Sequence, residues 1–363
     1  MKLQVTQENL SRALNTVARV ASTRGTLPIL ANVLIKTIDN RVSISATNLD
    51  VAITQFIGAK IIEPGSITLP ARLMQDYIAS LPSGVVELEL DDQKLHIKSD
   101  KYQSTINGVP ADDFPEMPAI INGGTVIIPS EVLKAGLQQT IPAAGSDDAR
   151  PVLTGMYMHT DKGQLYLVAT DSYRLAEKKV YKTAESISLL IPASAAQDVL
   201  RVLVDETKDV SITYDEQQVQ FLIGDIKIVS RLIDGTYPNY RGLIPSSFEN
   251  IATLLKSDFV SITKVSSLFA RESAGSVTLQ LDSDQRCVRI HSIASQVGEN
   301  TAQVDADVSG NGSITLNSRY ILDALSAIKG DEIVLSFNGK LEPCVLKDSK
   351  NKDYLHVIMP LKS

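Results

Sequence analysis

One short segment of the chain collects side chains that could perform chemistry. Residues 169–175 read Ala-Thr-Asp-Ser-Tyr-Arg-Leu, which places a carboxylate, hydroxyls, a phenol and a guanidinium side by side. An acid, a base and an anion clamp held together are what many enzymes use, so a catalytic site at Asp171, Tyr173 and Arg174 is one hypothesis. The same composition is also typical of a strand end that leads into a loop.

Other catalytic or ligand-binding motifs do not support an enzyme. The four histidines lie in separate strand-like segments, at 96, 159, 291 and 356, and no pair has the i, i+4 spacing of a zinc helix. The sequence has neither a GxxxxGK[ST] phosphate loop nor a GxSxG elbow. Asp282 and Asp284 lack the glycine and the distal glutamate of a calcium loop, which favours a hairpin turn. We therefore predict no metal and no cofactor.

Composition and charge narrow the class of protein. The chain has 363 residues, of which 44% are hydrophobic and 21% charged, so two or three folded domains are expected. Its formal net charge of −7 argues against a surface that is basic throughout, and any DNA contact must be local. Two cysteines, no apolar signal core at the N-terminus and no long apolar run predict a cytoplasmic protein without a membrane span.

The elements that would position these residues belong to an internal repeat. Four segments have counterparts displaced by the same 123 residues that separate Pro28 from Pro151. They are 5–10 with 128–133, 26–32 with 149–155, 46–48 with 169–171, and 114–115 with 237–238. Several matches at one offset predict a duplicated domain.

A third copy appears in the second half of each unit. The segments 67–70, 189–192 and 314–317 each lead into a helical pattern, which is followed by an alternating strand at 86–90, 210–214 or 333–337. The first half begins with another helix, in which Leu10, Leu14, Val17 and Ala18 recur at helical spacing. The order helix, strands, helix, strands predicts an α+β fold with antiparallel sheets, repeated three times.

Segments that contain Pro, Gly, Ser and Asn residues mark the predicted boundaries between the repeats. The first linker is predicted around 115–124 and the second around 245–250. The expected domains are therefore 1–121, 122–248 and 249–363.

The repeated motifs also carry a resemblance. The segment 168–176 resembles the central-domain signature of the bacterial beta sliding clamps, the processivity subunits of the replicative DNA polymerase. The segment 230–241 is similar to a second signature of that family, 357–361 to its C-terminal tail, and 24–30 to its N-terminal domain. The resemblance covers the whole chain and agrees with the threefold repeat.

This resemblance implies a fold and a function. Two chains would join head to tail, and their six domains would close a ring lined by helices, which encircles duplex DNA. Such a ring needs no catalytic residue, because it tethers the polymerase, the clamp loader and repair polymerases, and thereby raises their effective concentration at the DNA. Phosphate contacts carry no sequence information and permit sliding.

The resemblance also implies a groove for short partner peptides. The groove residues are Leu153, Thr170, Ser172, Tyr173, Arg174, Leu175, Pro238, Leu243, Val357, Met359, Pro360 and Leu361, with a neighbouring subsite at Asn317 and Tyr320. Tyr173 and Gly242 depart from the family pattern, where the best-known members have His and Arg. An apolar groove with a few fixed polar groups suits peptide anchors.

Two further sets of residues follow from the ring. The basic residues expected to face DNA are Arg24, Arg72, Lys134, Arg150, Arg201, Lys264 and Arg319, with Arg12 and Arg19 as further helix candidates. The subunit contact is expected to join an edge strand near Ile106 to a region near Leu268 and Phe269.

Two alternatives to the ring stay open at this point. One is the enzyme built on a repeated α+β scaffold, which predicts turnover of a small molecule. The other is a repeat scaffold that binds protein partners without DNA. Retention on closed circular DNA, but not on linear DNA, distinguishes a ring from that scaffold.

Overall fold

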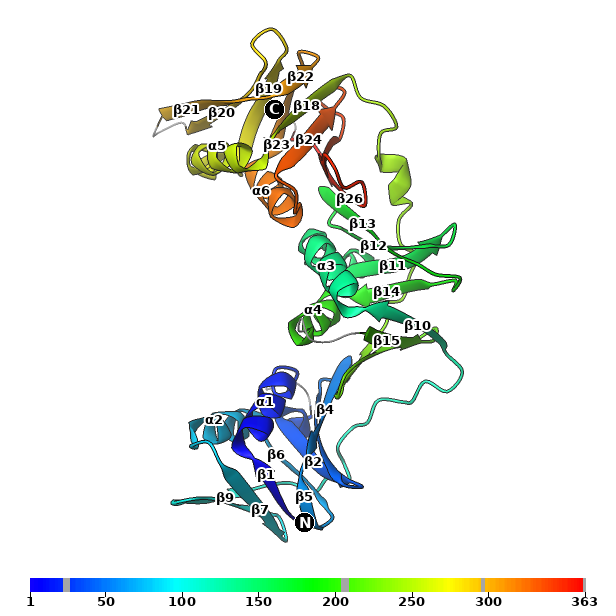
Figure 1. The fold of residues 1–363 in the computed structure, drawn as a ribbon, viewed down its shortest axis with the longest axis vertical. Helices are drawn as coiled ribbons and strands as arrows, with labels where there is room; N and C mark the ends of the chain where they lie inside the picture. Colours follow the sequence, from blue (N-terminus) through cyan, green and yellow to red (C-terminus); the bar gives the residue numbers. More distant parts are fainter. Residues whose placement is uncertain (22–26, 204–208, 295–297, 362–363) are drawn as a thin grey trace. The chain divides into compact units, whose positions relative to one another are not determined.

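The computed structural model describes residues 1–21, 27–203, 209–294 and 298–361, which form two compact units (Figure 1). Unit 1 comprises Met1–Glu131 and Arg201–Leu232, and unit 2 comprises Val132–Leu200 and Ile233–Ser363. The central repeat contributes strands to both units. Arg24, one of the residues expected to face DNA, lies outside the described residues.

The described chain contains two α-helices in each of the three repeats, as predicted. Their bounds are α1 Gln7–Val17, α2 Ala71–Ser80, α3 Ser130–Thr140, α4 Ala193–Val202, α5 Lys256–Phe269 and α6 Ser318–Ala327. Short 3-10 helices are η1 Pro28–Ala31, η2 Ile141–Ala143, η3 Pro151–Leu153, η4 Tyr240–Leu243 and η5 Arg271–Ser273. η1 and η3 occupy the repeated Pro-Ile/Val-Leu motif, so the sequence match corresponds to a structural match.

Helix α1 shows how the apolar spacing fixes the fold. The Thr6 hydroxyl accepts a hydrogen bond from the backbone N–H of Asn9 and caps the N-terminus of the helix. Leu10, Leu14 and Val17 then lie on one face, and all three are buried. The helical pattern predicted from these residues is confirmed.

Unit 1 holds two antiparallel sheets. The five-stranded sheet has the order β5-β1-β7-β8-β9, with β1 Lys2–Thr6, β5 Lys60–Glu63, β7 Val85–Asp91, β8 Lys94–Ser99 and β9 Tyr102–Asn107. In β7, Val86 and Leu88 are buried whereas Glu87 and Glu89 are exposed, which is the predicted alternation. Strand β9 is an edge of this sheet.

The second sheet of unit 1 joins the first two repeats. Its order is β10-β15-β16-β17-β4-β3-β2-β6, and β4 of the first repeat pairs with β17 of the second. Its strands are β2 Asn32–Ile38, β3 Arg41–Thr47, β4 Val51–Gly58, β6 Ser66–Pro70, β10 Gly124–Pro129, β15 Asp209–Tyr214, β16 Gln218–Ile223 and β17 Ile226–Arg231. Asp39 takes a positive φ in the turn between β2 and β3.

Unit 2 repeats this arrangement one domain later. Its nine-stranded sheet has the order β14-β11-β12-β13-β26-β25-β24-β18-β22, and β13 pairs with β26. The strands are β11 Gly155–Asp161, β12 Gln164–Thr170, β13 Arg174–Lys182, β14 Ser188–Pro192, β18 Asn250–Leu255, β22 Asp307–Ser309, β24 Glu332–Phe337, β25 Cys344–Asp348 and β26 Tyr354–Ile358. One sheet therefore continues across each junction between repeats.

The third repeat closes with a four-stranded sheet in the order β21-β20-β19-β23. Its strands are β19 Ser276–Asp282, β20 Cys287–Ala294, β21 Gly298–Asp305 and β23 Ser313–Asn317. Phe259 of α5 and Phe337 of β24 are fully buried in the core of this repeat. The turn between β19 and β20 contains Asp284, so the hairpin interpretation of the acidic segment is confirmed.

Both cysteines, Cys287 and Cys344, are buried and free. Burial raises the pKa of the Cys344 thiol to about 12, which makes this thiol unreactive at neutral pH. Among the described helices, none combines the length and the apolar character that a membrane crossing requires.

Candidate functional site

The segment that resembled a catalytic site is a tight turn between β12 and β13. The Thr170 hydroxyl donates to the Arg174 carbonyl at 2.6 Å and accepts from the Ser172 N–H. The Asp171 carboxylate accepts from the N–H groups of Tyr173 and Arg174, each at 2.9 Å. Ser172 takes a positive φ of 78°, which the turn requires. These polar side chains therefore stabilise the backbone of the turn.

Arg174 ties this turn to the third repeat. Its guanidinium pairs with Asp171 at 3.1 Å and with Asp323 of α6, and it lies over the ring of Tyr320 at 4.6 Å from the centroid. Arg174 itself is largely buried. A cation with two carboxylates and an aromatic face is held in one position. Asp171 and Arg174 thus neutralise each other's charge. Tyr173 is 57% exposed, so its aromatic ring is accessible to solvent.

A pocket of about 410 Å³ opens beside this turn and brings two predicted sites together. The subsite residues Asn317 and Tyr320 line it, together with Tyr173. Arg150 and Arg319, which were expected to face DNA, line the same pocket. Arg150 pairs with Asp147 at 3.1 Å and donates to the Ser172 hydroxyl at 3.0 Å. The basic residues of this pocket are therefore neighbours of the predicted groove.

The apolar part of the predicted groove lies on the paired strands β13 and β26. Leu175 and Val357 are directly opposite each other in this ladder, and both are buried in one apolar cluster. Leu153 and Thr170 are also buried, whereas Leu243 is 48% exposed and Pro238 is exposed. Of the residues predicted for the groove, those on the paired strands thus belong to a core, whereas Pro238 and Leu243 are accessible.

The C-terminal segment that follows strand β26 contains three of the residues predicted for the groove. The Met359 N–H donates to the Tyr173 carbonyl at 2.8 Å, and the Leu361 N–H donates to the Thr315 carbonyl at 2.9 Å. Met359, Pro360 and Leu361 are half-buried. These bonds explain how a segment so close to the chain end is held against the sheet.

An aromatic cluster packs around the segment that leads into the second linker. The sequence alone did not predict it. The rings of Tyr157 and His159 stack at 4.6 Å, and those of Tyr157 and Tyr237 at 4.8 Å. His159 shares a hydrogen bond of 2.9 Å with the Tyr240 hydroxyl, which also donates to Glu177. Burial, together with the charge of Arg241, lowers the pKa of His159, so its ring is neutral at neutral pH.

This cluster, which we call the linker anchor, consists of Tyr157, His159, Tyr166, Tyr237 and Tyr240. It anchors the segment that carries Pro238 and Leu243. The available signal in the sequence was the placement of large aromatic side chains at i, i+2 on β11, opposite Tyr166 on β12.

The other basic residues expected to face DNA lie on helices or near their ends. Arg72 and Arg319 occupy the second position of α2 and α6, and both are exposed. Arg201 lies in the last turn of α4, so it is not at the equivalent position. Lys134 of α3 is half-buried and Lys264 of α5 is exposed.

The residues expected at the subunit contact differ in exposure. Ile106 of the edge strand β9 is only 7% exposed, because its side chain lies on the buried face of the sheet. Leu268 of α5 is 54% exposed and Phe269 is half-buried. The subunit contact near Ile106 stays a prediction, and Ile106 itself does not supply exposed apolar surface to it. What β9 presents is its backbone edge.

Comparison with known proteins connects these features to a family. Residues 1–118, 127–239 and 241–362 match the models of the N-terminal, central and C-terminal domains of the DNA polymerase III beta subunit. The beta sliding clamp of Bacillus subtilis is 30% identical over 377 residues, with complete coverage of both chains. That of Staphylococcus epidermidis is 30% identical over 376 residues, again with complete coverage of both chains.

Solved structures agree with the sequence matches. The sliding clamp of Bacillus subtilis superposes with a TM-score of 0.96 at 30% identity, covering 100% of this chain and 99% of that one. The clamp of Bartonella birtlesii bound to griselimycin gives 0.96 at 29% identity, and that of Pseudomonas aeruginosa bound to griselimycin gives 0.95 at 25% identity. Both comparisons cover 100% of each chain.

Proposed function

The chain belongs to the DNA polymerase III beta subunit family, the beta sliding clamps, and on this premise we propose how its residues serve a processivity clamp. A clamp is not an enzyme, because its output is the retention of other enzymes on DNA. The observation that carries the function is the match of all three repeats, over the whole chain, to the domains of these clamps. We assign the domains to 1–121, 122–248 and 249–363, and place the protein in the cytoplasm.

The ring is proposed to form from two chains joined head to tail. Strands β9 and β21 are edges of their sheets, and an unpaired edge favours pairing with another strand. Lys98 of β8 and Lys101 of the turn before β9 outnumber Asp100 beside that edge, whereas β21 carries Glu299 and Asp305, so the charges of the two edges are complementary. Exposed Leu268 would add apolar contact near this junction.

Duplex DNA is proposed to contact the ring through scattered basic side chains on the helices. Arg72, Lys264 and Arg319 are exposed there, although the whole chain carries a net charge of −7. Contacts with phosphates hold any sequence equally well, so the ring slides. The topological link then prevents loss of the clamp, and tight binding is unnecessary.

The groove is proposed to bind peptide segments of the replicative polymerase, the clamp loader and repair polymerases. Leu175 and Val357 supply the apolar floor, and Leu243 with Met359 supplies accessible walls. Backbone and ion-pair contacts hold the turn at 170–174 and the tail in place before a partner arrives. A site that is ordered in advance loses little entropy on binding.

Retention on circular DNA tests this function. Clamps are loaded by a clamp loader onto a nicked circular plasmid and then separated from free protein by gel filtration. We expect the clamp to stay on the circle and to be lost when a restriction enzyme linearises it. Equal loss from the circular and the linear DNA would contradict a topological link.

A further inference from the structure

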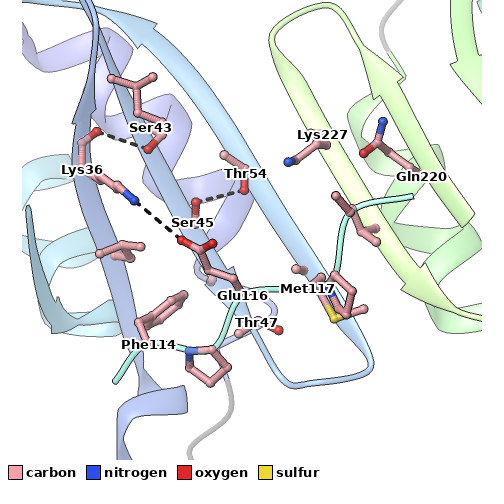
Figure 2. A pocket seen from close by; sticks show the side chains of 18 of the residues that line it. Lys36, Ser43, Ser45, Thr47, Thr54, Phe114, Glu116, Met117, Gln220 and Lys227 are labelled. Carbon is pink, nitrogen blue, oxygen red and sulfur yellow. Dashed lines mark hydrogen bonds and ion pairs between the residues drawn. The ribbon is translucent and has the colours of Figure 1, made fainter. Parts of the chain in front are cut away.

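Unit 1 contains a second pocket, distinct from the groove described above. It has a volume of about 380 Å³ and lies on the face of the eight-stranded sheet formed by β2, β3, β4 and β17. The linker after the first repeat, with Phe114, Glu116 and Met117, passes over these strands and closes one side (Figure 2).

The backbone around this pocket repeats that of the partner groove. Ala52 pairs with Val229 in the ladder of β4 and β17, and Leu175 pairs with Val357 in the ladder of β13 and β26. Ala52 and Leu175 are separated by the repeat offset of 123 residues. The strands that build the groove floor in unit 2 thus have direct counterparts in unit 1.

The turn and the linker repeat as well. The Thr47 hydroxyl donates to the Val51 carbonyl at 3.0 Å, and Leu49 takes a positive φ of 78°, the value found at Ser172. Phe114 is buried under the linker as Tyr237 is, again at the repeat offset. The backbone of the strands, the turn and the linker is therefore repeated in the two units, but it carries different side chains.

These differences explain why unit 1 has a pocket there. The linker anchor of unit 2 fills the corresponding space with the rings of Tyr166 and Tyr240. At the repeat offset, Ser43 stands in place of Tyr166 and Met117 in place of Tyr240. The loss of these two aromatic rings leaves open space between the strands and the linker.

The charged groups of the pocket favour an anionic ligand. Lys36 and Lys227 line it, and Glu116 is the sole carboxylate among the lining residues. Lys36 reaches Glu116 at 3.7 Å, and both side chains are well exposed, so this ion pair is weak and replaceable. Ser45 and Thr54 share a hydrogen bond of 2.9 Å on the pocket floor and add polar groups (Figure 2).

The linker backbone favours a peptide over a small molecule. Within the described residues, the N–H groups of Glu116 and Met117 make no backbone hydrogen bond, and Pro115 and Pro118 prevent regular strand pairing there. A peptide chain lying beside the linker could satisfy these groups, as in strand addition.

We propose that this pocket is a second peptide site, which binds a short acidic segment that places an aromatic side chain beside a carboxylate. The ring would occupy the space above Ser43, and the carboxylate would pair with Lys36 or Lys227. The inference rests on the proposed function in one respect, namely that the equivalent frame in unit 2 is the partner groove. It goes beyond that function because it gives the clamp a second site with different selectivity.

The experiment is a titration of the full-length protein, labelled at Leu, Val and Met methyl groups, followed by NMR. The probe is acetyl-Glu-Phe-Glu-amide, and the matched probes are acetyl-Gln-Phe-Gln-amide and acetyl-Glu-Ala-Glu-amide. Met117 and Val229 report on the new pocket, whereas Leu175 and Met359 report on the groove. We expect the acidic aromatic probe to shift Met117 and Val229. Removing either the charge or the ring should weaken binding about five-fold or more.

Variants separate the pocket from other sites. Ser43→Tyr restores the ring found in unit 2 and should abolish the shifts at Val229. Lys227→Gln should weaken binding about five-fold even if Ser43→Tyr folds poorly. Lys94→Gln, at an exposed position of strand β8, is the matched control and should leave binding unchanged.

Three results would overturn the proposal: no shifts at all, shifts confined to Leu175 and Met359, or equal binding of the acidic and the glutamine probe. The titration needs neither DNA nor a clamp loader. A failure here therefore leaves retention on circular DNA intact, and a failure of retention leaves the titration interpretable.

Discussion

Arg174 and Asp323, which are 149 residues apart in the sequence, form an ion pair that joins the second and third repeats. Arg174 begins strand β13, and Asp323 lies in the middle of α6. The pair fixes the turn at 170–174 against the third repeat. It thereby holds the turn beside Tyr320, which belongs to the proposed peptide subsite.

Replacing Arg174 should therefore affect stability and binding together. Arg174→Gln leaves two partly buried carboxylates without their cation, which should lower the free energy of unfolding by about 1 to 3 kcal/mol. We expect weaker peptide binding as well, because the turn loses its anchor. Urea denaturation and calorimetric titration with a polymerase-derived peptide measure the two effects. Arg286→Gln, at an exposed hairpin turn, is the control and should change neither quantity.

The accessible walls of the groove provide a cleaner test of the peptide site. Leu175 is 2% exposed, so its truncation would also open a cavity in the core. Leu243→Ala combined with Met359→Ala removes accessible apolar surface, and should cost about 1 to 3 kcal/mol of peptide affinity. Calorimetry measures the affinity, and a sizing measurement checks that the oligomeric state is unchanged.

Removal of Met359 through Ser363 extends this test. Strand β26 ends at Ile358, so the deletion spares the strand and removes only the residues that follow it. Peptide binding and polymerase stimulation should be lost, while the subunit contact stays nearly intact. Unchanged peptide affinity in a folded variant would place the partner site elsewhere.

Much of the fold could be predicted from the sequence because each repeat shows its own hydrophobic pattern of helices and strands. Leu10, Leu14 and Val17 define a helix by spacing alone, and the alternation in β7 defines a strand. A match at one offset of 123 residues then links the repeats. Local patterns and an internal repeat were sufficient for the fold class.

The site could be predicted only where motifs carried a resemblance. The stacking of His159 on Tyr157 and the bond of Tyr240 to Glu177 depend on which strand faces pack together, and spacing does not give that. The burial of the Ile106 side chain on the edge strand β9 is another example, since an edge strand has one face turned inward. Tertiary packing decided these positions.

The subunit contact can be tested at Leu268. Leu268→Asp places a charge on an exposed apolar position of α5, and desolvating this charge in an interface should weaken dimerisation by about 100-fold or more. Analytical ultracentrifugation across a range of concentrations measures this shift. Leu222→Asp, at an exposed position of β16, is the matched control. A variant at Leu268 that dimerises as tightly as the unchanged chain would move the contact elsewhere.

The DNA-facing arginines can be tested by salt dependence. Arg72→Gln with Arg319→Gln removes two exposed charges near helix N-termini. If both contact phosphates, the slope of log K against log salt concentration should fall by about 0.9 for each. Weak binding to a long linear duplex, measured at several salt concentrations, gives this slope. An unchanged slope would show that these two residues do not contact DNA.

The buried His356 should make stability depend on pH. Burial, with the nearby charge of Arg174, lowers the pKa of His356 to about 3. An unfolded histidine titrates near 6.5, so below that pH the unfolded chain binds a proton that the folded chain does not. Stability is therefore unaffected by this group above about pH 6.5, and it falls as the pH drops from about 6.5 toward 3.

Between pH 7.5 and pH 5.0 this histidine should remove about 2 kcal/mol from the free energy of unfolding. His356→Gln should lose most of that difference, because no imidazole remains to bind the proton. Tyr354→Phe is the matched control: it removes the hydroxyl that shares a hydrogen bond of 2.8 Å with His356 but keeps the buried ring. This control should be less stable at both pH values and still show the pH difference. Urea denaturation of the three proteins at the two pH values measures these free energies, and an equal pH difference in His356→Gln and the unchanged chain would contradict the prediction.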